Sequence, residues 1–369
     1  MISKAVGYAG QGVGLVGKGV SLVGKGIKGV FTGKDYRPIL PIPRHEELKK
    51  YPPPTFHINL DLPPKERWAE VIAHFKPALQ DFRKHFKYIL PYNAIHFVLS
   101  KFYSHDHLDE MRAIAELAEV EFNLLYTVNL VYETATRCTS IVLRTEDGKI
   151  IHGYNMDFGL QKFIANLTFK GIFHKNGQVL YQANAVAGSV GMPNGVKPGK
   201  FSITLNERYH GFLGLKNMYY ILFKGGCEPL QLIREVLEKA NSFEEAVKMV
   251  SETKLIAPGF FTISGPDDGV IVTRSHGGVE EKTWLGSTQK DENNWFIVQT
   301  NYDRKTGDPK FDTRRSPAES KLSAIGPKAI NPKVLADEIL AEYPNFISKT
   351  IWTAVMTPQT GGFDITMWY

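Results

Sequence analysis

Short runs of alternating apolar and polar residues fill the chain after residue 138, and this period of two is typical of β-strands with one buried face. The runs read TSIVLRT, KIIHGYNMDF, LTFKGIFHKNGQVLYQANAVA, KFSITLNERY, GFFTISGPDDGVIVTRS and WFIVQTNYD. Turn-forming pairs occur among them at Asp147-Gly148, Asn176-Gly177 and Asp268-Gly269. The pattern predicts strands joined as antiparallel hairpins.

Two segments in the same half have helical spacing instead, EPLQLIREVLEKA and SFEEAVKMVSET. Ser242 stands at the N-cap of the second, with Glu245 three residues on, which is the spacing of a capping box. Grouped helices beside runs of antiparallel strands are typical of α+β layers and not of a doubly wound sheet.

Helical spacing dominates the chain before residue 138. The stretch PPKERWAEVIAHFKPALQDFRKHFKYIL begins with prolines, which suit the first turn of a helix, and the stretch 106–137 keeps its apolar residues on one stripe. We therefore expect three parts: a glycine- and lysine-rich arm with a proline-rich linker over 1–50, a helical segment over 51–137, and a core over 138–369.

The arm has a composition of its own. Residues 13–19 read VGLVGKG and residues 20–26 read VSLVGKG, and the first 34 residues contain lysines but no acidic residue. On a helix, a seven-residue period places Lys18 and Lys25 on one side and apolar residues on another. The pattern predicts contact of residues 1–34 with a membrane surface or with a membrane-protein complex. A flexible glycine-rich arm is the alternative.

Composition narrows the classes of function. The 369-residue chain has a formal net charge of +6 but no run of five basic residues, so we expect no nucleic-acid partner. We see neither an apolar run of about 18 residues, as an ordinary transmembrane helix needs, nor a secretory signal. Two cysteines, Cys138 and Cys227, make no disulfide framework. The glycines of the arm imitate nucleotide-binding spacing without a preceding strand, so we expect no cofactor and no metal.

One of these cysteines begins a strand in TRCTSIVLRTEDGKIIHGYNMDFG. If Asp147 and Gly148 are the two turn residues, cross-strand partners have numbers that sum to 295, and Cys138 lies opposite Asp157. The same register turns Tyr154 to the other face of the hairpin from Cys138. A charged group beside a cysteine can tune it as a nucleophile. A buried structural cysteine is the alternative that spacing alone leaves open.

Four segments together resemble acid ceramidase and N-acylethanolamine acid amidase, which are N-terminal-nucleophile hydrolases of the choloylglycine-hydrolase type. The segments are INLDLPPKERW, CTSIV with GKIIHGYNMDFG, KPGKFSITLNERY and VQTNYDRKTGDPKFDTRRSPA. The resemblance covers roughly residue 55 to the C-terminus, with order and spacing kept. It implies a four-layer αββα sandwich, a hydrolase of linear lipid amides such as ceramides or N-acylethanolamines, and a precursor that cuts itself before the cysteine.

The resemblance also implies roles for particular residues. Cys138 would be the nucleophile, and its freed α-amine, with a pKa of about 7.7–8.0 in short peptides, would act as the base. Asp157 would orient that amine, Asn301 would donate to the oxyanion, and Arg314 would hold the site together. Two further assignments complete the set: Glu207 would assist self-cleavage, and Tyr154 and Asn155 would lie on the substrate side.

The chain departs from the family pattern in places that matter. Tyr154 stands where the family has an arginine beside the nucleophile, and a neutral hydroxyl replaces a permanent charge with five donors. Arg315 and Arg208 are cations that could replace that charge. Without one, we expect an ordinary thiol, self-cleavage that is slow or absent, and a chain that remains continuous through Arg137-Cys138. The family's secretory signal and its cross-linking cysteines are also missing, which counts against the family's lysosomal address.

Two interpretations therefore remain open. In the first, the chain is a lipid-amide hydrolase that uses Cys138. In the second, it is a catalytically impaired scaffold that serves as an accessory subunit of a membrane complex, reached through residues 1–34. A mitochondrial complex is one such host, because the N-terminus is basic and lacks acidic residues.

Overall fold

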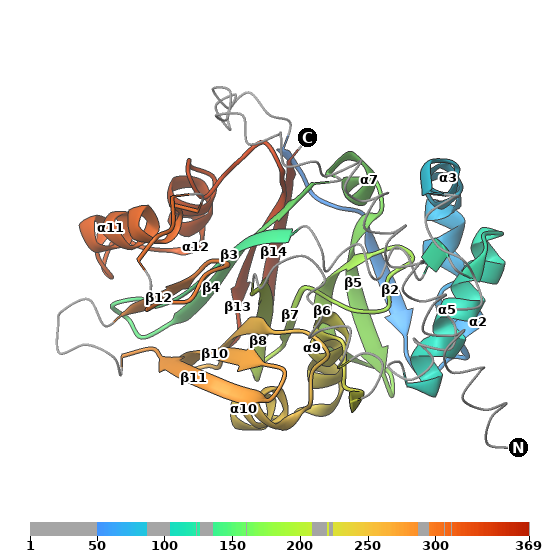
Figure 1. Cartoon of the computed structure of the whole chain (residues 1–369), viewed down its shortest axis with the longest axis horizontal. Coiled ribbons are helices and arrows are strands. Elements are labelled where there is room, and N and C mark those ends of the chain that lie inside the picture. Colours follow the sequence, from blue (N-terminus) through green and yellow to red (C-terminus); the bar gives the residue numbers. More distant parts are fainter. Residues whose placement is uncertain are drawn as a thin grey trace, which may run out of the picture.

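Two β-sheets packed face to face form the centre of the protein (Figure 1). This computed structural model describes residues 50–86, 104–122, 124–125, 136–159, 161–208, 220, 224–286, 295–305, 307–310 and 312–368. The arm, most of its linker and residues 126–135 lie outside the described residues, and so do the predictions made for them.

The first sheet has six strands, all paired antiparallel. In spatial order they are β1 (Lys50–Tyr51), β14 (Gly362–Trp368), β13 (Thr350–Thr357), β4 (Ile150–Phe158), β3 (Thr136–Arg144) and β12 (Phe296–Gln299). Cys138 is the third residue of β3, between β4 and β12, so it begins an interior strand as predicted.

The second sheet has eight strands. In order they are β11 (Gly278–Trp284), β10 (Gly269–Ser275), β9 (Gly259–Ser264), β8 (Phe201–Glu207), β7 (Asn194–Lys197), β6 (Gln178–Val186), β5 (Thr168–Lys175) and β2 (Thr55–Asn59). Seven of them pair antiparallel, and β2 joins β5 in parallel. Strand β8 crosses β3, so the second sheet forms the floor under the start of β3.

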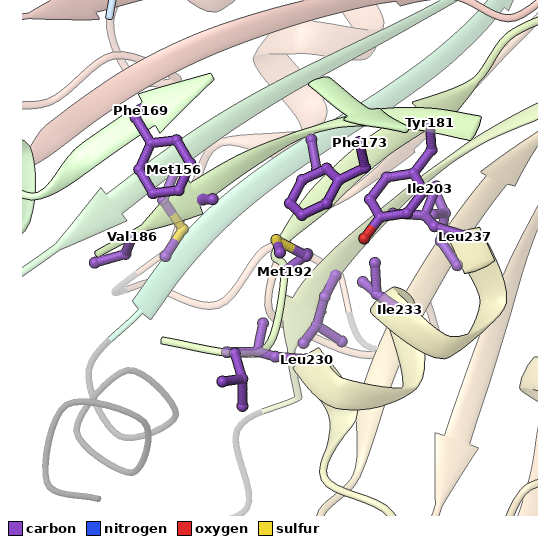
Figure 2. Packing of buried hydrophobic residues seen from close by; sticks show 14 of the residues in the cluster. Met156, Phe169, Phe173, Tyr181, Val186, Met192, Ile203, Leu230, Ile233 and Leu237 are labelled. Atoms are coloured by element: carbon purple, nitrogen blue, oxygen red, sulfur yellow. The ribbon is translucent and has the colours of Figure 1, made fainter. Parts of the chain in front are cut away.

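Helices cover the outer face of each sheet, which completes the αββα order (Figure 1). Helices α9 (Pro229–Lys239) and α10 (Phe243–Glu252) pack on the eight-stranded sheet, and α11 (Arg315–Ile325), α12 (Pro332–Val334) and the π-helix η4 (Leu335–Leu340) pack on the six-stranded one. Figure 2 shows how this works for α9: Leu230, Ile233 and Leu237 point from one face of the helix toward the sheet residues Tyr181 and Ile203. The short helix α7 (Gln161–Ala165) connects β4 to β5.

The N-terminus of α10 confirms the capping box in part. Ser242 Oγ accepts from the backbone N–H of Glu245 at 3.2 Å, as the spacing predicts. The Glu245 carboxylate, however, accepts from the backbone N–H of Asn241 at 2.7 Å, one residue before the expected partner. Both bonds satisfy backbone donors that a helix leaves unpaired at its start.

The register of the β3–β4 hairpin corrects the sequence prediction. The hairpin closes through Thr145 N–H donating to the Lys149 carbonyl at 2.9 Å, which leaves a three-residue loop with Gly148 at φ +81°. Cross-strand numbers therefore sum to 294, and Cys138 lies opposite Met156, not Asp157. Because a slip of one residue reverses the face of every side chain, Tyr154 lies on the same face as Cys138.

The segment before the core contains helices as expected, and one of them is interrupted. It contains α2 (Pro64–Arg67), α3 (Ala69–Phe86) and α5 (His105–Ala118), but the helix expected over 106–137 ends at Ala118, where Glu119 takes the left-handed conformation. The segment also supplies β1 to one sheet and β2 to the other. None of the described helices is both long and apolar enough to cross a membrane.

Candidate active site

The Cys138 side chain points into the space between the two sheets and is only 1% exposed. Its Sγ atom lies 3.2 Å from the Tyr154 hydroxyl and 3.5 Å from the Met156 sulfur. The same hydroxyl lies 2.9 Å from the carbonyl oxygen of Leu205 on β8. Tyr154 therefore covers the sulfur and connects it to the facing sheet.

This environment favours the protonated thiol. Burial raises the pKa of Cys138 to about 12. The Tyr154 hydrogen bond and the Arg314 charge lower that pKa, but they do not offset burial, and the Asp157 and Glu207 carboxylates raise it further. The thiolate, which is the reactive form, is thus scarce at neutral pH in this arrangement.

The backbone of Cys138 is held on both sides of its α-carbon. Its N–H donates to Asn301 Oδ1 at 2.9 Å, and its carbonyl accepts from Arg314 Nη1 at 3.1 Å. Asn301 follows β12, and its Nδ2 donates to the carbonyl of Glu207 at 2.7 Å. Because the Nδ2 amide group carries two protons, Asn301 can donate its second N–H to an oxyanion while the first stays on that carbonyl.

The Arg314 guanidinium is the centre of the site. Besides the Cys138 carbonyl, it donates from Nη2 to Asn301 Oδ1 at 2.7 Å and from Nη1 to Asp157 Oδ2 at 3.2 Å. The Asp312 carboxylate accepts from Nε at 2.6 Å and from Nη2 at 2.5 Å. The backbone turns at Asp312, and α11 begins directly after Arg314, so both residues are placed by one short segment.

Asp157 on β4 lies opposite Arg137, and not opposite Cys138 as predicted. Its Oδ1 accepts from the Thr350 hydroxyl at 2.6 Å. Burial raises the pKa of Asp157 to about 6, although the Arg314 charge and the Thr350 hydrogen bond lower it. Asp157 can thus gain or lose a proton near pH 6, as a group that takes part in proton transfer must.

A buried hydrogen-bond network joins the two sheets below the nucleophile. Ser140, two residues after Cys138, lies 2.7 Å from the Thr204 hydroxyl, and Thr204 lies 3.1 Å from His152 Nε2. The other ring nitrogen of His152 lies 2.9 Å from Ser202. Burial lowers the pKa of His152 to about 3, so the ring is neutral and serves as a cross-link between β4 and β8.

The structure does not bring Asn155 to the nucleophile. Its amide donates to the carbonyls of Leu340 and Asn345 at 2.6 and 3.0 Å, and its oxygen accepts from Thr353 at 2.7 Å. These partners lie on the outer face of the six-stranded sheet, away from Cys138. The expected substrate contact is therefore not part of the arrangement around the sulfur.

The two cations proposed to replace the family arginine are paired elsewhere. Arg208 binds Glu280 at 2.7 Å and Asp303 at 2.6 Å, and Arg315 lies 3.4 Å from Asp308. The charge lost at residue 154 is therefore not restored at the sulfur by either of them.

Two residues of the site escaped the sequence reasoning, Asp312 and Thr350. Asp312 belongs to the DTRR sequence, where an acid two residues before an arginine is a weak signal for an ion pair. Thr350 carries no signal, because it is 193 residues from Asp157 in the chain.

Two family models match the chain. Residues 51–105 match the beta subunit of N-acylethanolamine-hydrolyzing acid amidase, and residues 138–316 match the linear amide C-N hydrolases of the choloylglycine hydrolase family. The second match begins at Cys138.

Whole-length relatives agree with these matches. The chain is 34% identical to an acid ceramidase of Heterocephalus glaber, with 83% of each chain covered. It is also 34% identical to an N-acylethanolamine-hydrolyzing acid amidase of Mus musculus, with 85% of this chain and 88% of that protein covered. Among solved structures, a Caenorhabditis elegans N-acylethanolamine-hydrolyzing acid amidase ortholog matches at a TM-score of 0.54 and 30% identity, over 60% of this chain and 93% of that one.

Proposed function

Because this chain belongs to the acid ceramidase and N-acylethanolamine acid amidase family of linear amide C–N hydrolases, we propose that it hydrolyses linear lipid amides with Cys138 as the nucleophile. The relatives are named for ceramide and for N-acylethanolamines, and either class offers an amide bond between a fatty acyl chain and a hydroxylated amine. Acyl-chain length and head group are not part of the proposal.

One observation carries this proposal. The Arg314 guanidinium contacts the Cys138 carbonyl, Asn301 and Asp157 at once, so four of the residues expected from the resemblance gather around the backbone of Cys138. Positions 138, 157, 301 and 314 come from β3, β4, the end of β12 and the start of α11. Such convergence of titratable and hydrogen-bonding groups on one cysteine supports a reaction centre.

The first reaction of the proposed enzyme is cleavage of its own chain. The Cys138 sulfur attacks the carbonyl carbon of Arg137, the peptide C–N bond breaks, and the Cys138 nitrogen leaves as an amine after taking up a proton. Water then hydrolyses the thioester, which restores the thiol and leaves a carboxylate on Arg137. Asn301 Oδ1 already contacts the leaving nitrogen at 2.9 Å, so the site holds that nitrogen in place through the reaction.

Turnover repeats the same chemistry on a substrate amide. The free α-amine of Cys138 takes the thiol proton, the thiolate attacks the acyl carbon, and the protonated amine group returns a proton to the departing amine. Water hydrolyses the resulting thioester to the fatty acid. The second N–H of Asn301 Nδ2 is the donor to the oxyanion, while the first stays on the Glu207 carbonyl.

The test compares wild type with Cys138→Ala, using Cys227→Ser as the matched control. Release of fatty acid from a ceramide and from an N-acylethanolamine is followed alongside chain cleavage on a denaturing gel. We expect Cys138→Ala to lose both activities and Cys227→Ser to keep both. Equal turnover by wild type and Cys138→Ala would refute the proposed nucleophile.

The covered sulfur of Cys138 favours a second candidate function, in which the chain is a catalytically impaired scaffold. Tyr154 is neutral, and burial raises the pKa of Cys138, which together describe a poor nucleophile. In this alternative, the fold serves as an accessory subunit of a membrane complex, with residues 1–34 as the tether and a mitochondrial complex as one host. Wild type that is neither cleaved nor active, yet co-purifies with a membrane complex only when residues 1–34 are present, would favour it.

A further inference from the structure

Asp312 makes the closest contacts of the Arg314 guanidinium. Its two carboxylate oxygens accept from Nε at 2.6 Å and from Nη2 at 2.5 Å, a two-point pairing in which both groups are buried. Charge-assisted pairs of this geometry are the strongest that arginine forms, and they fix the plane of the guanidinium as well as its position.

From this pairing, and resting on the function proposed above, we infer that Asp312 is a positioning residue: it orients Arg314 toward Cys138, Asn301 and Asp157 and takes up most of its positive charge. Asp312 does not contact the sulfur or the bond that would be cut, so it acts through Arg314.

The orientation follows from counting the donors. The edge formed by Nε and Nη2 is occupied by Asp312, which leaves the remaining Nη2 proton for Asn301 and the Nη1 protons for the Cys138 carbonyl and Asp157. Without Asp312, the same edge would be free to pair with Asp157, and the guanidinium would turn away from the Cys138 carbonyl.

Asp312 and Asp157 share the positive charge of the Arg314 guanidinium, and the closer pair takes the larger share. Asp312 takes two short contacts, whereas Asp157 has a single contact at 3.2 Å. The other groups that face Asp157 are Arg137 on β3, the Cys138 thiol and the Thr350 hydroxyl on β13. Burial raises the pKa of Asp157 to about 6 against the opposing charge of Arg314, and the Asp312 carboxylate adds to the rise.

Asp312 thereby keeps Asp157 able to bind a proton near pH 6. A group with a raised pKa stabilises the fold fully below its unfolded pKa, and that stabilisation is lost as the pH rises through the folded pKa. The unfolding free energy of wild type minus that of Asp157→Asn should therefore fall with rising pH between about pH 3.8 and about pH 6, with its midpoint near pH 5. This difference reports the ionisation of Asp157 without any need for enzyme activity.

The experiment repeats that difference measurement in an Asp312→Asn background, by urea unfolding between pH 4 and pH 8. Asn keeps the shape of Asp312 and removes its charge, so Arg314 is released to pair with Asp157. We expect the folded pKa of Asp157 to fall by about one unit or more, which moves the midpoint down by about half a pH unit or more. Asp303→Asn is the matched control, because it removes a carboxylate from a different arginine, Arg208, and should leave the midpoint unchanged.

A loss of stability in Asp312→Asn with an unmoved midpoint would overturn the inference and leave Asp312 a purely structural partner. Should Asp312→Asn not fold, Asp312→Glu takes its place. Its longer side chain cannot keep both contacts, so a smaller downward shift is expected, and an unmoved midpoint again overturns the inference. Wild type that never cleaves or turns over would refute the proposed function, yet the titration would still decide the role of Asp312.

Discussion

Tyr154 is the residue that most affects the chemistry available to Cys138. Its hydroxyl is neutral and lies 3.2 Å from the sulfur, at the position where the sequence resemblance implies an arginine. A cation there would favour the thiolate, whereas a phenol offers only one hydrogen bond, which does not offset the burial that raises the pKa of the thiol.

We therefore expect Tyr154→Arg to accelerate chain cleavage and amide hydrolysis by about tenfold or more, since each unit removed from the pKa of a scarce thiolate raises its population about tenfold. Tyr154→Phe, which keeps the ring and removes the hydroxyl, should not accelerate either reaction. Cleavage is followed by gel and hydrolysis by fatty-acid release. Equal rates in wild type and Tyr154→Arg would show that charge at residue 154 does not limit the reaction.

The two cysteines should differ in reactivity. Cys138 is buried with a raised pKa, whereas Cys227 is half-buried. Iodoacetamide at pH 8 should alkylate Cys227 in the folded chain and leave Cys138 unmodified, and both should react in urea. Peptide mass mapping measures the extent at each position. Preferential labelling of Cys138 in the folded state would contradict the arrangement of Tyr154 and Met156 over the sulfur.

Sequence reasoning succeeded for residues that carry a motif and failed for those that do not. Cys138, Asp157, Asn301 and Arg314 stand in recognisable segments, and the structure brings them together. Thr350 completes the hydrogen bonding of Asp157 from a strand that the pattern did not predict, because β13 reads as a continuous buried run with no alternation.

At the scale of elements, the β3–β4 hairpin shows how one local detail controls the site. Asp147-Gly148 suggested a two-residue turn, but Thr145 closes the loop through bonds to both the N–H and the carbonyl of Lys149. The added loop residue moves the register by one and places Tyr154, not Asp157, on the face of Cys138. The Thr145 side chain helps to set this turn, and it lies outside the Asp147-Gly148 pair from which the turn was predicted.

Helix α5 is anchored to the core by one buried carboxylate. Glu110 accepts from Arg234 Nη1 at 2.5 Å and from Nη2 at 2.8 Å, and it also pairs with Arg67. These contacts join the segment before Cys138 to α9 of the core. If the chain is cleaved before Cys138, Glu110 is one of the groups that keep the two pieces together.

Glu110→Ala should lower the unfolding free energy by about 3–5 kcal/mol, because it removes the carboxylate that pairs with Nη1 and Nη2 of the buried Arg234, whose Nε keeps its pair with Glu238. Glu116→Ala, on the same helix, removes only an exposed pair with Lys65 and should cost less than about 1 kcal/mol. Urea unfolding at pH 7 measures both. Similar small losses for the two variants would contradict the anchoring role of Glu110.

The same carboxylate gives a pH dependence of opposite sign to that of Asp157. Burial raises the pKa of Glu110, but Arg234 outweighs burial and holds that pKa at about 2. A depressed pKa adds stability above the unfolded value, and this is lost as the pH falls from about 4.5 toward about 2. In Glu110→Ala, the unfolding free energy should therefore fall less steeply as the pH decreases over that range. An unchanged slope would show that Glu110 is not the source of the stability lost at acid pH.

At the scale of the whole molecule, the expected arm over residues 1–34 differs in composition from the rest of the chain. Deleting it should change the melting temperature little, because its glycines contribute little helix propensity, and should abolish membrane fractionation or co-purification. Thermal unfolding and fractionation of the full chain and the deletion variant check both. A large fall in melting temperature would show that the arm belongs to the fold.

The layered αββα fold joins these scales: the six-stranded sheet and the helices on it bring β3, β4, β12 and the start of α11 to one cysteine, and the eight-stranded sheet faces its sulfur through β8. The alternation of the strands and the family resemblance predicted this architecture. The pairing of β1 and β2 with strands far along the chain could not be predicted, since both are short and carry no partner signal of their own.

The intact mass of the purified chain, followed over time from pH 4 to pH 8, tests the central claim most directly. Because the reactive thiolate is scarce, we expect wild type to convert only slowly into two polypeptides that meet at Arg137 and Cys138, with the larger beginning at Cys138, while Cys138→Ala stays continuous. Wild type that remains one continuous chain throughout, under conditions in which Tyr154→Arg is cleaved, would contradict the account of wild type as a self-processing hydrolase.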